Sequence, residues 1–481
     1  MNHPALQFGP VAPELMLVGA ASVLLLAVAV VKGLDERALL LGSLAAVVGA
    51  AVASLLLWHW KGPTYVLGGM VAADKFAVIA RLILLGVGAI ALVFGYHYFQ
   101  GTGESRGEFY PLLLFALSGM TLITAAADLI VVFLALEILS LSLYVLTGFS
   151  FRLAASEGAM KYFLLGAFSS AFFLYGIALA YGAAHTTNIA AIAREFTGRV
   201  GPIPLALAAS GLLAVGFAFK VAAVPFHMWT PDAYQGAPTA VTAFMSAATK
   251  VAAFAALIRV FDTAFNPLAW DWTPFIVVLS AVTMVVGSVL AIAQTDIKRM
   301  LAYSSVAHAG FILVGVSAAT QDGITASLFY MLAYAAMILG GFGIVMLVSV
   351  RGEERTQLGS YAGLARRSPL LAGLLTVFLL SLAGIPPTAG FIAKVSVFSA
   401  AVRAGHWPLV LVAVLASVVA AFFYLRVIVL MYMQETQEEP MPAAGRLPTI
   451  AVAAPAVPTL LFGVFPGLIY GVLHTAAVLR W

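Results

Sequence analysis

Long apolar stretches separated by short polar connections follow one another along the whole chain. A helix that crosses a bilayer needs roughly 20 mostly apolar residues, and the sequence contains about fourteen such segments. Strand-type alternation of apolar and polar positions is absent from the sequence. The pattern therefore predicts an all-α polytopic membrane protein. The predicted spans are residues 12–32, 38–58, 76–96, 110–127, 128–150, 158–182, 204–229, 239–261, 273–294, 299–319, 325–350, 369–402, 408–433 and 449–475.

The loops carry an orientation signal. Lys and Arg are more numerous in the loops after odd-numbered spans than in the loops after even-numbered spans. By the positive-inside rule, the odd loops lie in the cytoplasm and both termini lie on the outer side of the membrane. The residues before the first span contain no Lys or Arg, so this span is expected to remain in the mature protein rather than act as a cleavable signal.

Composition strengthens the membrane prediction. Of the 481 residues, 63% are hydrophobic and 9% are charged. A soluble domain carries roughly 25% charged residues, so a soluble fold and a disordered chain are both excluded. Cysteine is absent, which excludes disulfides, iron–sulfur ligation, Cys-bound zinc and covalently attached c-type haem.

Several ionisable residues fall inside the predicted spans. A lysine at the bilayer centre costs roughly 2.5–3.5 kcal/mol, so four of them must face protein or water. The bases outnumber the acids and cannot all be neutralised by pairing, which is typical of a proton pathway. The plainer alternatives are structural ion pairs, lysines that reach the interface, and histidines satisfied in the core. The residues are Glu137, Lys161, Lys220, Lys250, Lys394, His227 and His308.

Two spans contain proline breaks. Pro225 interrupts span 7, and Gly384, Pro386 and Pro387 interrupt span 12. Irregular backbone at that depth is tolerated only where it lines a cavity or is buried in protein. Aligning Pro225 with Pro386 matches the two breaks and predicts two inverted five-helix repeats, spans 4–8 and spans 9–13.

The repeats give a domain division. The predicted parts are N-terminal flanking helices at 1–109, a first repeat at 110–262, a second at 263–433 and a C-terminal span at 434–481. Asp128 is expected to cap the start of span 5. Arg81 and Arg426 lie inside spans 3 and 13, and the sequence offers no account of either.

Four stretches resemble a known family. They are PFHMWTPDAYQGAPT at 225–239, LEILSLSLYVL at 136–146, EGAMKYFLLGAF at 157–168 and DIKRMLAYSS at 296–305. Together they are similar to the antiporter-like membrane subunits of proton-pumping NADH:quinone oxidoreductase (respiratory complex I), and the likeness extends over nearly the whole chain. Three features favour the subunit N group: the run at 234–236, a lysine at Lys394 where subunit M resembles this pattern with a glutamate, and an end close after span 14 without the lateral helix of subunit L.

The resemblance implies residue roles. Glu137 would pair with Lys220, Lys250 would link two half-channels, and Lys394 would be the terminal proton donor or acceptor. Lys161 would tune Glu137 and Lys220. His308 and His227 would carry protons between sites.

The resemblance also implies partners and location. NADH, FMN, iron–sulfur clusters and quinone are expected in partner subunits, with no cofactor or metal in this chain. The chain would be a non-redox subunit of a translocase in a bacterial cytoplasmic membrane, next to other antiporter-like subunits. It would be driven by redox-coupled changes in its neighbours.

Three alternatives remain open from the sequence. The chain could belong to a multi-subunit Na⁺/H⁺ antiporter of the same superfamily, and neighbouring genes would distinguish that case. It could be a passive scaffold whose lysines form structural pairs. It could also carry haem on His227 and His308, which an absorbance spectrum would reveal.

Overall fold

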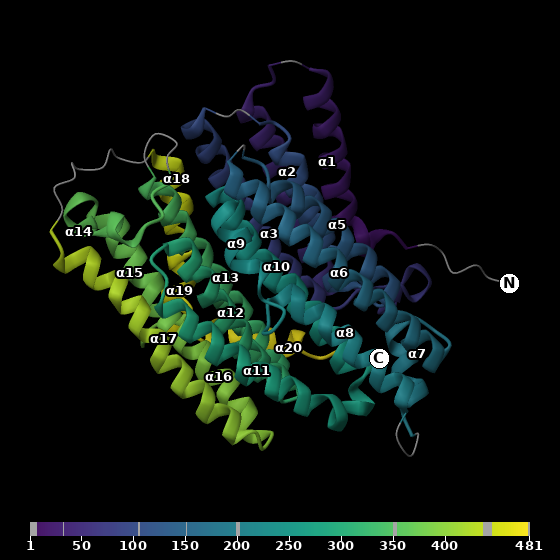
Figure 1. Cartoon of the computed structure of the whole chain (residues 1–481). Coiled ribbons are helices and arrows are strands. Elements are labelled where there is room, and N and C mark those ends of the chain that lie inside the picture. The colour runs from purple at the N-terminus through teal and green to yellow at the C-terminus, as the bar shows by residue number, and fades with distance from the viewer. Residues whose placement is uncertain are drawn as a thin grey trace.

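The computed structural model describes residues 7–31, 33–103, 106–150, 152–198, 203–349, 354–435 and 445–479. Helices dominate these residues, and they pack side by side as a bundle (Figure 1). The N-terminal part consists of α1 (Ala12–Val30), α2 (Glu36–Leu56), an antiparallel hairpin of β1 (Tyr65–Val66) and β2 (Val71–Ala72), and α3 (Lys75–Thr102).

The rest of the chain adds seventeen helices to the bundle. The first seven are α4 (Phe109–Ala125), α5 (Leu129–Thr147), α6 (Leu153–Ala184), α7 (Ile189–Phe196), α8 (Pro204–Val221), α9 (Trp229–Gly236) and α10 (Thr239–Arg259). The remaining ten are α11 (Ala269–Ile292), α12 (Ile297–Val316), α13 (Gln321–Val348), α14 (Leu364–Arg367), α15 (Pro369–Ala383), α16 (Ala389–Arg403), α17 (Trp407–Met433), α18 (Arg446–Ala453), α19 (Ala456–Val464) and α20 (Gly467–Ala476).

The all-α membrane prediction is confirmed. In the described part of the chain, 12 helices are long and apolar enough to cross a membrane. The predicted span 4 is the shorter helix α4, and the predicted span 12 consists of α15 and α16. The total of fourteen spans therefore stays a prediction.

Two regions differ from the sequence prediction. The predicted continuous span 14 is three short helices, α18 to α20, because Pro455 and Pro466 stand directly before α19 and α20, where proline ends one helix and suits the start of the next. The loop after span 6 contains α7, which Asn188 caps by accepting a hydrogen bond from the amide of Ala191 (2.9 Å).

Helix starts follow ordinary capping chemistry. Asp128 accepts a hydrogen bond from the amide of Ile130 (2.8 Å), which confirms its predicted role at the start of α5. Asp74 caps α3 in the same way through Ala77 (2.8 Å). These carboxylates satisfy amide groups that the first helical turn leaves without partners.

The centre of the bundle is α10. Every residue of this helix is buried, and it packs against α3, α4 and α13 (Figure 1). The many alanines of α10 allow its neighbours to approach closely, so protein rather than lipid covers every side of this helix. The centre of the bundle therefore places Lys250 away from lipid.

The bundle has two ends. The first, called here the terminal face, carries the β hairpin, the loops at 126–128 and 188, and the end of α20; bridges Val71–Ala126 and Asp128–Asn188 join these loops. The opposite face carries the loops at 293–296 and 354–363, which a bridge between Asp296 and Gln357 joins. The two faces give every later contact a position along the bundle.

Candidate functional site

Both predicted helix breaks are present. Helix α8 ends at Val221, followed by Ala222 in the left-handed conformation (φ 60°), and α15 ends before Gly384, also left-handed (φ 85°). Matching these two residues makes Pro225 correspond to Pro387. The predicted alignment with Pro386 is therefore wrong by one residue. The double proline in span 12 offers two choices that sequence alone does not separate.

Lys220 is buried just before the first break. Its ammonium donates a hydrogen bond to the hydroxyl of Ser140 on α5 (2.6 Å) and lies over the ring of Tyr144 (5.5 Å). Ser140 in turn donates to the carbonyl of Leu136 on its own helix. The immediate partner of this lysine is therefore a hydroxyl.

Glu137 is half-buried one turn before Ser140. Its carboxylate accepts a hydrogen bond from Ser170 on α6 (2.6 Å). Glu137 acts on Lys220 electrostatically, but no ion pair joins them within the described residues. In place of the expected direct pair, each group binds a different serine: Glu137 binds Ser170 on α6, and Lys220 binds Ser140 on α5.

Lys161 lies in a different cluster from the one expected. Its ammonium pairs with Glu157 (2.6 Å) and with Asp232 on α9 (2.7 Å), and Asp232 also pairs with Arg299 (2.6 Å). Burial raises the pKa of Asp232, but the hydrogen bonds from Lys161 and Arg299 outweigh it and hold the pKa below its usual range. Lys161 therefore holds the helix that follows the first break, rather than touching Glu137.

Lys250 reaches the first break from a neighbouring helix. Its buried ammonium donates to the carbonyl of Val221, the last residue of α8 (2.6 Å). The last carbonyls of a helix have no intrahelical partner and carry partial negative charge. They are therefore a suitable binding site for an ammonium group inside the membrane.

Lys394 occupies a matching place at the second break. Its buried ammonium donates to the carbonyls of Leu382 (3.2 Å) and Ala383 (2.8 Å) at the end of α15, and to the hydroxyl of Ser417 (2.7 Å). It also lies over the ring of Phe311 (4.8 Å). Each break thus ends in carbonyls bound by a lysine.

His308 is buried, and its ring packs against Phe311 (5.8 Å between centroids), the ring over which Lys394 lies. Lys250 and Lys394 both act on His308 electrostatically. Its Nδ1 is 2.8 Å from the hydroxyl of Tyr330, and its Nε2 is 3.2 Å from the hydroxyl of Tyr424. The sequence analysis did not identify these tyrosines, although each lies on a predicted span and carries a polar group that needs a buried partner.

His227 is not joined to this group. It is half-buried in the loop between α8 and α9, and its Nδ1 has no hydrogen-bond partner. Its ring lies 6.4 Å from that of Tyr303. Within the described residues, no hydrogen bond connects His227 to Lys250 or His308.

Arg81 and Arg426 have structural partners. Arg81 pairs with Glu14 on α1 (2.9 Å) and donates to the carbonyl of Pro10 (3.1 Å). Arg426 donates to the carbonyls of Ile292 (2.9 Å) and Gln294 (2.6 Å) at the end of α11. Both arginines therefore join peripheral helices to the bundle.

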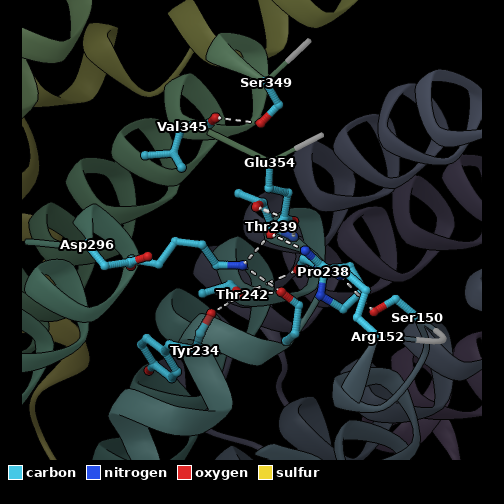
Figure 2. A network of polar contacts seen from close by, with 12 residues as sticks. Ser150, Arg152, Tyr234, Pro238, Thr239, Thr242, Asp296, Val345, Ser349 and Glu354 are labelled. Carbon is cyan, nitrogen blue, oxygen red and sulfur yellow. Dashed lines mark hydrogen bonds and ion pairs between the residues drawn. The ribbon is translucent and has the colours of Figure 1, made fainter. Parts of the chain in front are cut away.

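Glu354 is the centre of a buried polar network at the opposite face (Figure 2). It pairs with Arg152 (2.9 Å) and Lys298 (3.1 Å), and it accepts from Tyr98 (3.0 Å) and from the amide and hydroxyl of Thr239 (2.9 and 2.7 Å). Burial raises the pKa of Glu354, but the two cations outweigh it and lower the pKa to about 2. One ionised carboxylate therefore connects α3, α10, α12 and the start of α6.

Comparisons with known proteins agree with the predicted resemblance. The family described as NADH:quinone oxidoreductase/Mrp antiporter, TM, matches residues 126–420. NADH-quinone oxidoreductase subunit N of Chloroflexus aggregans is 44% identical over 485 residues, which cover 99% of each chain. Many other relatives carry the same name, including that of Acidothermus cellulolyticus at 44% identity over 96% of this chain and 94% of its own.

Solved structures show the same fold. A chain of respiratory complex I from Thermus thermophilus with bound aureothin matches with a TM-score of 0.81 at 35% identity, over 96% of this chain and 100% of that one. A chain of the Mrp complex from a Dietzia species matches with a TM-score of 0.84 at 24% identity, over 97% of each chain, and this likeness shows the fold alone. The antiporter alternative therefore has the weaker support. The chain belongs to the subunit N family of NADH-quinone oxidoreductases.

Proposed function

We propose that this chain moves protons across the membrane as a subunit of an NADH:quinone oxidoreductase, as the names of its relatives suggest. One observation carries the proposal: the buried ammonium groups of Lys250 and Lys394 bind the open ends of two broken helices and both act on His308. Ionisable groups at this depth mark ion pathways because they are too costly to keep without use.

The first half of the relay is centred on Lys220. Its ammonium is held by Ser140 and attracted at longer range by Glu137 on the same helix, α5. A redox-coupled movement from neighbouring subunits that shifts α5 against α8 changes this attraction. When the attraction weakens, Lys220 passes its proton toward Lys250, which is bound to the adjacent residue, Val221.

The second half carries the proton from Lys250 through His308 to Lys394. Tyr330 and Tyr424 hold the two ring nitrogens of His308, and a tyrosine hydroxyl can both donate and accept. The ring can therefore take up a proton on one side and release it on the other. Lys161 has a supporting role through Asp232, and His227 supports proton entry at the first break.

The proposal includes the repeat organisation. Residues 110–262 and 263–433 form two inverted repeats, with flanking helices at 1–109 and 434–481 and with both termini on the outer side. The matching ends of α8 and α15, each followed by a residue in the left-handed conformation, support this division. The terminal face is then the outer face of a bacterial cytoplasmic membrane.

Redox chemistry is assigned to partner subunits. The chain has no cysteine to ligate iron–sulfur clusters, and the described residues contain no group of three or more His, Asp or Glu side chains placed to hold a metal ion. We propose that NADH, FMN, iron–sulfur clusters and quinone are bound by other subunits of the complex. This subunit, among other membrane subunits, supplies proton transfer only.

The proposal is tested in inverted membrane vesicles that contain the whole complex. NADH-driven proton uptake and quinone reduction are measured for Glu137→Gln and Lys220→Ala. We expect fewer protons moved per electron in both variants. Lys61→Met, at an exposed loop lysine, is the matched control and should behave as the unaltered complex. Unchanged stoichiometry in both Glu137→Gln and Lys220→Ala would contradict the proposal.

A further inference from the structure

We infer that Asp262 is a proton-release site at the terminal face, connected to His308 through the hydroxyl groups of Ser327 and Tyr330 on α13. The inference rests on the proposed function and adds an outlet that neither helix break supplies. It assigns to a carboxylate outside the lysine relay the task of passing protons to surface water.

Asp262 is a buried acid with one carboxylate oxygen to which no described residue makes a hydrogen bond. It lies in the π-helical turn Val260–Ala264 that continues α10, is 6% exposed, and its Oδ2 has no hydrogen-bond partner. Arg259, one turn earlier, is already bound by both oxygens of Asp74 (2.7 and 2.9 Å). A buried carboxylate without a partner is costly, so such a group holds a proton, water or a cation.

Other charged groups lie on the helices around Asp262. Helix α7, which packs on the π-helical turn, carries Arg194 and Glu195. Asp322 at the start of α13 pairs with Arg403 (3.2 Å) and lies 3.9 Å from His474. No ion pair joins any of these groups to Asp262 in the described part of the chain.

Asp262 lines a small polar cavity at the terminal face. The cavity has a volume of about 180 Å³ and is lined by Asp262, Asn266, Thr320 and Gln321, with Ile324 and Val478 among its apolar residues. Its volume is enough for several water molecules. A larger hollow of about 580 Å³, lined by Asp74, Lys75 and His474, shares Gln321 and Val478 with it. Asp262 is therefore within reach of surface water.

A line of side chains leads from this cavity toward the relay. Ile324, Ser327, Tyr330 and Tyr334 are spaced three, three and four residues apart, which places them on one side of α13. Ile324 lines the cavity, and Tyr330 is hydrogen-bonded to His308. The distance along the helix axis from Ile324 to Tyr330 is about 9 Å. The cavity and the relay are thus two helical turns apart.

One hydroxyl group on this line has no partner among the described residues. The Oγ of Ser327, which lies one turn from both Ile324 and Tyr330, is buried and without a hydrogen bond. Buried polar groups without protein partners are where internal water is expected. Water at Ser327 would connect Tyr330, and through it His308, to the cavity that Asp262 lines.

The test uses the absence of cysteine from the chain. Asp262→Cys is placed in the whole complex, and the purified complex is treated with 2-carboxyethyl methanethiosulfonate, which restores a carboxylate at this position, before it is reconstituted into vesicles. We expect proton uptake per electron to fall several-fold in Asp262→Cys and to return with this reagent. Methyl methanethiosulfonate, which adds an uncharged group, should not restore it. Val260→Cys, in the same turn but outside the cavity lining, and the unaltered complex are the matched controls.

The outcomes separate the inference from the proposed function. Asp262→Asn should lower proton uptake per electron, whereas Asp262→Glu should retain most of it. Normal pumping in Asp262→Asn, together with loss in Glu137→Gln and Lys220→Ala, would overturn the inference and leave the proposed function standing. If Asp262→Asn fails to assemble, the cysteine variant decides: loss of pumping that the carboxylate reagent does not restore would also overturn the inference.

Discussion

The two helix breaks end in the same way but obtain their lysine differently. At the first break, Lys250 comes from a separate helix and binds the carbonyl of Val221. At the second, Lys394 comes from the half-helix that follows and binds the carbonyls of Leu382 and Ala383. Open carbonyls at a helix end attract a cation wherever it comes from in the sequence. The position of an ammonium in space is therefore the common feature.

The segments after the breaks are also held differently. Helix α9 is anchored by charge, through Asp232 to Arg299, and the following residue, Ala237, accepts from Lys298 (2.6 Å). Helix α16 is longer, and its contacts near the break are the amide of Gly390 with Ser381 (3.1 Å) and the bonds of Lys394. The first break is thus fixed by ion pairs at the opposite face, and the second by its own lysine.

The largest expected effect follows from replacing the break lysines with arginine. Lys250→Arg and Lys394→Arg keep a cation for the helix ends, but arginine stays protonated at all accessible pH values. We expect the complex to assemble while the subunit loses at least about tenfold in proton transfer. Proton uptake per electron in vesicles checks this. Normal pumping in both variants would show that these lysines only stabilise the breaks.

The next effect concerns Glu354, which pairs with Lys298, the lysine that binds Ala237 after the first break. Glu354→Gln leaves Lys298 and Arg152 without their carboxylate, which should destabilise the subunit by about 3 kcal/mol. Thermal inactivation of the purified complex measures it. Glu435→Gln, in the exposed pair with Arg366 (3.3 Å), is the control and should change stability by less than about 1 kcal/mol.

The stability lost in Glu354→Gln should also depend on pH. Because the pKa of Glu354 is lowered to about 2, its stabilisation is complete above its ordinary value of about 4.3 and is lost as pH falls toward 2. The difference between the unaltered complex and Glu354→Gln should therefore be constant above about pH 5 and shrink below about pH 4. A difference that shrinks as pH rises would contradict the assignment.

A smaller effect compares the two left-handed residues. At Gly384, an added Cβ would lie 2.8 Å from Cδ of Lys394 in a conformation unfavourable to alanine. Gly384→Ala should cost about 1–2 kcal/mol and disturb the lysine. Ala222→Gly relieves the same backbone strain at the first break, so it should change stability by less than about 1 kcal/mol. Thermal inactivation of both variants tests this difference. A loss of stability in Ala222→Gly as large as that in Gly384→Ala would contradict the prediction.

The smallest effect concerns the hydrogen bond from Lys220 to Ser140. Ser140→Ala removes the hydroxyl that binds Lys220, which should cost about 1 kcal/mol and slow proton transfer several-fold. Ser142→Ala, whose hydroxyl donates only to the carbonyl of Ile138 (3.0 Å), is the matched control on the same helix. Faster pumping in Ser140→Ala than in Ser142→Ala would mean that this hydrogen bond restrains Lys220 instead of positioning it.

Apolar length and proline chemistry were enough to predict most of the long helices and both breaks, but not α7 or the division of span 14 into three helices. The same sequence reasoning selected Lys220, Lys250, Lys394 and His308 as ionisable residues inside spans, because charge stands out where nearly every neighbour is apolar, and all four are buried. These signals are local, so they can be found in a window of about 20 residues.

The partners of these groups could not be predicted in that way. Lys250 and Lys394 bind backbone carbonyls, which every residue possesses, so apart from the hydroxyl of Ser417 no side chain marks an acceptor. Glu354 meets Tyr98 and Arg152 across 256 and 202 positions of the chain, and no periodicity relates such distant positions. In the sequence, Glu354 looks like an ordinary charged loop residue, and only the structure shows that its side chain is buried.

The use of backbone carbonyls as lysine acceptors has a genetic consequence. No substitution at Val221, Leu382 or Ala383 removes a carbonyl, because the acceptor is common to all amino acids. Random mutagenesis that blocks proton transfer at the breaks should therefore recover changes in Lys250 and Lys394, or in the residues that hold the helix ends in place. No single codon change can therefore remove the carbonyl acceptors at either break. A mutation can affect them only by moving the end of the helix.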